Sequence, residues 1–91
     1  MTDEEKIDLG KRAKGVLENP LVTDALESMR QALVGQFFDC PVRDREALEE
    51  IHRMNKTLEA FVNHFEKIVA QGESAAAVLK KHIYDSERKV A

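Results

Sequence analysis

The sequence predicts an all-α protein built on an antiparallel helical hairpin, over about residues 20–38 and 45–71, with flanking helices near residues 3–18 and 75–88. Proline and glycine are scarce and charged residues make up 34% of the chain, a composition typical of soluble helical proteins. No segment alternates apolar and polar residues over the length of a strand. Apolar residues recur instead at steps of three and four, which is the period of a helix.

The first helix is expected to begin at Thr2, because Glu5 follows three residues later as in a capping box. Gly10 and Gly15 weaken this helix by roughly 1 kcal/mol each relative to alanine. Asn19 fits an N-cap, and the proline after it fits the first position of the second helix. Because proline disfavours helical angles in the residue before it, the first helix should end near residue 18.

The second helix carries an apolar stripe with steps of four, three and four, formed by Val22, Leu26, Met29 and Leu33. The dipeptide Cys40-Pro41 interrupts the helical pattern, and Asp44 is a candidate N-cap for the helix that follows. This connection is short. Short connections make neighbouring helices antiparallel, so the second and third helices should form a hairpin.

The third helix has the strongest pattern, an unbroken heptad series over three heptads. Its members are Ala47, Ile51, Met54, Leu58, Phe61, Phe65 and Ile68. Gly72 is a candidate C′ residue that ends this helix, and Ser74 could cap a last one. A single glycine can also lie inside a long helix, which leaves a continuous helix as the alternative.

The third helix is expected to be longer than the second helix, with a length of about 40 Å compared with about 28 Å. The apolar side chains at the C-terminal end of the third helix must then pack against the first helix, the last helix or a second chain. A two-helix hairpin buries too little apolar surface to offset the entropy of ordering its chain. We therefore expect one helical domain over residues 1–91, with a core hairpin at about 19–72, that forms a homo-oligomer. The expected interface residues are Phe61, Phe65, Ile68, Val69 and Phe38.

Two basic clusters suggest a second hypothesis, a small nucleic-acid-binding regulator or a DNA-packaging accessory. One cluster is Lys11, Arg12 and Lys14, and the other is Lys80 and Lys81, with Arg88 and Lys89 further on. Acidic residues lie near both clusters, the net charge is −3, and no aromatic residues are interleaved to stack on bases. These observations favour ordinary solvated helix faces over a nucleic-acid-binding surface.

No catalytic, cofactor or metal site is expected. Glu49 and His52 have the Glu-x-x-His spacing of di-iron bundles, but they fall on the polar face of the third helix and the motif occurs once. Cys40 is the single cysteine and has no base placed beside it by the sequence. No apolar run is long enough to span a bilayer, and the acidic N-terminus does not fit a signal peptide. A lone cysteine favours a reducing compartment.

From Asn19 onward the chain resembles small helical-hairpin proteins encoded by tailed bacteriophages and prophages. The resemblance covers about residues 12–72. It rests on Asn19-Pro20-Leu21, Ala25-Leu26, Met29, Leu33, the turn Pro41-Val42-Arg43-Asp44, and Phe61, Phe65, Val69 and Gly72. It implies a longer helix that ends near a glycine and no enzymatic activity. It also implies an accessory role in virion morphogenesis, in the cytoplasm of a bacterial host or in the virion, with other phage proteins as further partners.

Overall fold

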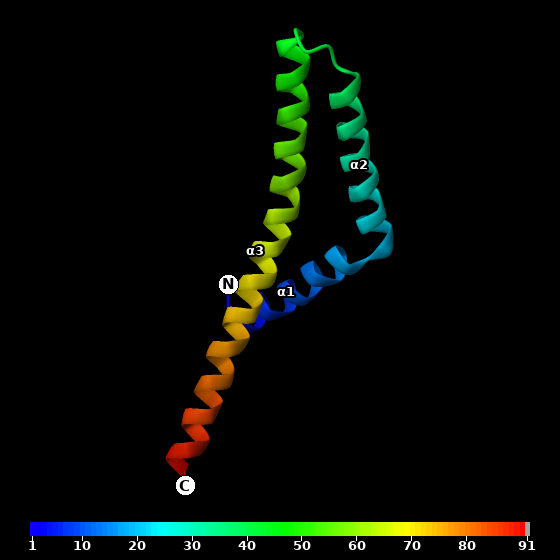
Figure 1. Cartoon of the computed structure of the whole chain (residues 1–91). Helices are drawn as coiled ribbons and strands as arrows, with labels where there is room; N and C mark the ends of the chain where they lie inside the picture. The colour runs from blue at the N-terminus through cyan, green and yellow to red at the C-terminus, as the bar shows by residue number, and fades with distance from the viewer. Residues whose placement is uncertain (91) are drawn as a thin grey trace. The chain divides into compact units, whose positions relative to one another are not determined.

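The computed structural model describes the backbone of residues 1–90 and the side chains of residues 1–86 (Figure 1). Every regular element in this part of the chain is an α-helix: α1 (Asp3–Glu18), α2 (Pro20–Asp39) and α3 (Arg45–Val90). The all-α class is confirmed. The predicted bounds of the first two helices, and the predicted start of the third, are confirmed to within one residue.

Local capping interactions place the starts of α1 and α2 as the sequence predicts. The Glu5 amide donates to the Thr2 hydroxyl at 3.2 Å, and the Thr2 amide donates to the Glu5 carboxylate at 3.5 Å, which completes a capping box. The Asn19 backbone is extended, and its side-chain oxygen accepts a hydrogen bond from the Leu21 amide at 2.9 Å. Both caps satisfy amides that the first turn of a helix leaves without partners.

A short loop reverses the chain between α2 and α3. Cys40 ends α2 with extended backbone angles, φ −77° and ψ 129°. The Asp44 amide then donates to the Pro41 carbonyl at 3.0 Å, and the Asp44 carboxylate accepts from the Ala47 amide at 3.1 Å. Asp44 is therefore the predicted N-cap of α3, and α2 and the first part of α3 form the predicted antiparallel hairpin (Figure 1).

The predicted helix end at Gly72 is wrong, as is the cap at Ser74. The segments expected at 45–71 and 75–88 are one helix of 46 residues, which corresponds to a length of about 69 Å. No glycine among the described residues has a positive φ, so Gly72 does not adopt the left-handed backbone of a helix C′ residue. The long helix implied by the phage resemblance likewise continues beyond this glycine. Because Gly72 has no side chain, the backbone of α1 can approach α3 closely at this position.

The chain divides into two compact units. One unit, Leu17–Asn63, contains α2 and the first part of α3. The other joins Met1–Val16 to the part of the chain from His64 onward, so that α1 packs on the later part of α3. Each unit has a small core: Leu26 is buried in the first, and Ala13 and Ala75 are buried in the second.

In the unit that contains α1, the two helix backbones touch at Gly10 and Gly72. A Cβ atom built on Gly72 would stand 3.0 Å from the Gly10 Cα and 2.9 Å from the Lys6 carbonyl oxygen. Ala13 and Ala75, three residues after each glycine, are buried. Small residues at these four positions allow α1 to lie directly against α3.

This contact shows what covers the far end of the long helix. Phe65, Ile68 and Val69 are half-buried in the same unit as α1, and Val69 lines a small hollow together with Ile7 of α1. The sequence left three candidates for the element that packs on this apolar stretch: the first helix, the last helix and a second chain. In the structure the first helix packs there. The predicted last helix cannot fold back over this stretch, because it is the continuation of α3.

Candidate functional site

An apolar groove runs between α2 and the first part of α3, with a volume of about 800 Å³. We call it the hairpin groove. Its α2 side contains no charged residue and is lined by Leu21, Val22, Ala25, Leu26, Met29, Ala32 and Leu33. Its α3 side is lined by Glu50, Arg53, Met54, Thr57, Leu58 and Phe61. The groove therefore collects the apolar stripes of both helices on one face of the hairpin.

Large apolar side chains in the hairpin groove remain in contact with solvent. Leu21 is 79% exposed, Met29 54%, Phe61 48% and Met54 43%. Among the described residues, Leu26 is the one side chain larger than alanine that is classed as buried. Scattered exposed apolar residues are ordinary on a protein surface, but a contiguous apolar face of this kind is typical of an interaction site.

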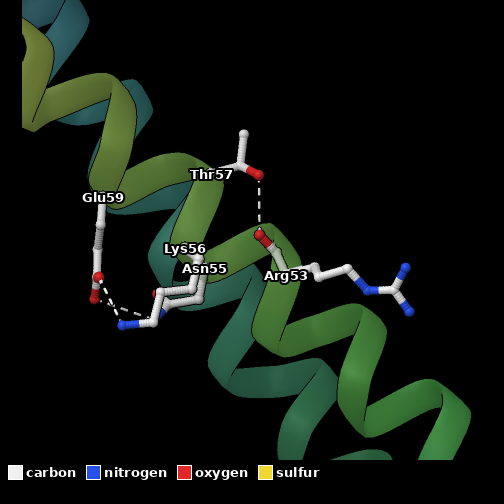
Figure 2. Close-up of polar contacts among 5 residues, drawn as sticks. All are labelled: Arg53, Asn55, Lys56, Thr57 and Glu59. Carbon is white, nitrogen blue, oxygen red and sulfur yellow. Dashed lines mark hydrogen bonds and ion pairs between the residues drawn. The ribbon is translucent and has the colours of Figure 1, made fainter.

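One polar side chain at the α3 edge of the groove is satisfied within its own helix. The Thr57 hydroxyl donates to the Arg53 carbonyl at 2.9 Å, so this hydroxyl is satisfied within the helix (Figure 2). Outside the groove lining, Asn55 and Lys56 both donate to the Glu59 carboxylate, at 3.3 and 3.4 Å. In Figure 2 the Arg53 side chain extends away from these three residues.

The five predicted interface residues are divided between the two compact units. Phe61 lines the hairpin groove. Phe38 is 77% exposed near the loop, with its ring centroid 5.8 Å from that of Phe37 in an edge-to-face arrangement. Phe65, Ile68 and Val69 belong to the other compact unit and are half-buried there. Among the five, Phe38 and Phe61 have the more exposed side chains.

The two basic clusters lie in the same compact unit. Lys11 and Lys14 line a hollow of α1 and α3 that also contains Glu73, and Arg12 forms an exposed ion pair with Asp8 at 3.0 Å. Lys80 and Lys81 are exposed on α3, eight and nine residues beyond the crossing at Gly72. The side chains of Arg88 and Lys89 lie outside the described residues.

The remaining polar candidates form no metal cluster in the described part of the chain. No group of three or more His, Cys, Asp or Glu side chains there is placed to hold a metal ion. Glu49 and His52 are both exposed on α3. The Cys40 thiol is half-buried in the loop, 3.7 Å from the Pro41 carbonyl oxygen. None of the helices in residues 1–90 is long and apolar enough to cross a membrane.

Sequence reasoning missed two features of this site. The first is Leu21, which joins the groove from a position beside the predicted Val22 stripe. The second is the pair Glu50 and Arg53 at the α3 edge, which are not members of the predicted heptad series. Their helical spacing from Met54 and Phe61 is the signal that could have placed them beside the groove.

Comparison with known proteins adds no relative from which a function could be transferred. No protein-family model matches the chain, and no curated protein or solved structure is significantly similar to it.

Proposed function

We propose that this protein is a non-enzymatic helical interaction protein that assembles with copies of itself through the hairpin groove. The observation that carries the proposal is the exposure of the groove, where large apolar side chains meet water over several turns of both helices. Burying such a surface is the main favourable term in protein association. Two helices of this length bury little apolar surface between them. Small domains often bury further apolar surface by associating with a partner.

The biological setting is proposed from the resemblance to small helical-hairpin proteins of tailed phages. On this basis the protein is a phage-encoded accessory or virion-morphogenesis protein, acting in the cytoplasm of a bacterial host or in the virion. The turn Pro41-Val42-Arg43-Asp44 supports the resemblance, because it forms the compact loop and N-cap between the two hairpin helices. A coding sequence located among head and tail genes would support this setting, and a location among unrelated metabolic genes would contradict it.

Self-association is tested by the mass of the full chain in solution. Analytical ultracentrifugation at micromolar concentration should give a multiple of the 10.3 kDa chain mass. Phe61→Glu should shift the mass toward the monomer, because it places a charge in the apolar groove. Ile83→Glu is the matched control, since Ile83 is similarly exposed on the same helix but lies outside the groove. A wild-type chain that stays monomeric would refute the proposal.

A further inference from the structure

We propose that the hairpin groove is the contact face of a two-fold symmetric dimer, in which a second copy of the chain presents the same groove. In this dimer Glu50 of each chain lies against Arg53 of the other. The inference rests on the proposed self-association through this groove, and it adds the two-fold symmetry and the polar residues that set the register. The dimer would contain a four-helix bundle made from the α2–α3 hairpin of each copy.

The exposed surface of the groove has a suitable size for this interface. Leu21, Met29, Met54 and Phe61 are each between about two-fifths and four-fifths exposed. At roughly 150–200 Å² for a large side chain, they leave on the order of 350 Å² per chain open to solvent. Each partner in a standard protein interface buries about 800 Å². These four residues alone therefore supply close to half of that area, before Val22, Leu33 and the groove alanines are counted.

The shape of the α2 side also suits close packing against another helix. Ala25 and Ala32 lie along the groove between the larger side chains of α2. Small residues at such positions leave room for side chains of a facing helix to enter, as in ridges-into-grooves packing. A facing hairpin offers Met54 and Phe61 as side chains of the size that enters such spaces.

The charges of the groove point to a second copy as its occupant. The polar edge contains one acid, Glu50, and one base, Arg53, which lie three positions apart on α3. Among the described residues, no hydrogen bond or ion pair joins either side chain to another side chain. A two-fold interface must be self-complementary, because residue i meets residue j twice. An acid and a base on the same edge satisfy this requirement, whereas a strongly charged foreign helix would leave one of them facing a like charge.

The test uses charge reversal with recovery in mixed samples. Glu50→Arg brings two arginines together at each of the symmetric contacts, and Arg53→Glu brings two glutamates together. Each variant should weaken dimerisation by about tenfold, because both pairs change from attractive to repulsive. An equimolar mixture of the two variants should recover wild-type association, since every contact then joins an arginine to a glutamate. The doubly reversed Glu50→Arg/Arg53→Glu chain should recover it as well.

Recovery in the mixture separates contacts between chains from effects within one helix. Analytical ultracentrifugation over a dilution series measures association, and far-UV circular dichroism checks that each variant keeps its helices. Glu49→Arg is the matched control, because it makes the same charge change beside the groove edge and should leave association unchanged. Wild-type dimers with no recovery in the mixture, or with variants that associate normally, would overturn this arrangement while self-association stands. A monomeric wild-type chain would overturn the proposed function itself.

Discussion

Replacing Gly72 with alanine is a direct test of how α1 packs on α3. The new Cβ would stand 2.9 Å from the Lys6 carbonyl oxygen and 3.0 Å from the Gly10 Cα. Both are backbone atoms, so no side-chain rotation can relieve the contact. The helices must separate by about half an ångström to restore ordinary van der Waals distances. Overpacking of this kind costs about 1–3 kcal/mol.

An opposing effect must be subtracted before this cost can be measured. Alanine is favoured over glycine inside a helix by about 1 kcal/mol. Gly15 in α1 and Gly35 in α2 provide the correction, because a Cβ on either one meets nothing within 4 Å. Gly15→Ala and Gly35→Ala should therefore raise the free energy of unfolding by about 0.5–1 kcal/mol. Gly72→Ala should fall about 1–3 kcal/mol below them.

Two measurements can detect the difference in stability between Gly72→Ala and the control variants. Urea unfolding, monitored by circular dichroism at one protein concentration, gives the free energy of unfolding of each variant. Hydrogen exchange of the α1 amides reports the contact locally, because an isolated helix of 16 residues is only marginally stable in water. The α1 amides should lose about tenfold in protection for each 1.4 kcal/mol of lost contact. If Gly72→Ala matches Gly15→Ala in stability and in α1 protection, the backbone contact at this crossing is refuted.

Further predictions test the hairpin, the caps and the surface. Leu26→Ala should lower the free energy of unfolding by about 2 kcal/mol, because it removes the large buried side chain of the hairpin; a urea titration showing no loss would contradict this. Asn19→Ala should cost about 1 kcal/mol in the same titration because the Leu21 amide loses its acceptor, whereas Asn19→Asp should retain stability. Arg12→Ala should change stability by less than about 0.5 kcal/mol, since its ion pair with Asp8 is exposed; a larger loss would assign that pair a structural role. Finally, the thermal unfolding midpoint should rise with protein concentration if the chain associates, and a constant midpoint would argue against association.

The sequence by itself determined where the helices begin and what their apolar faces contain. The interactions that start a helix join residues two or three positions apart, as between Asn19 and the Leu21 amide or between Asp44 and the Ala47 amide. Such contacts depend on the local chain alone, so the capping patterns predicted them correctly. The apolar stripes of α2 and α3 also follow from helical periodicity, and both enter the hairpin groove.

Tertiary structure decided the role of Gly72 and which segment packs on the later part of α3. In local terms a glycine after an apolar series favours a helix end, yet the heptad phase continues through Gly72 to Ala75 and Leu79. Which of these signals prevails depends on α1, whose Gly10 lies 62 positions earlier in the chain and touches Gly72 directly. Phe65, Ile68 and Val69 are half-buried in the unit that contains α1, whereas the Phe61 side chain is 48% exposed in the groove. Neighbouring turns of one apolar stripe thus acquire different surroundings, because burial is set by which distant segment reaches each stretch of the helix.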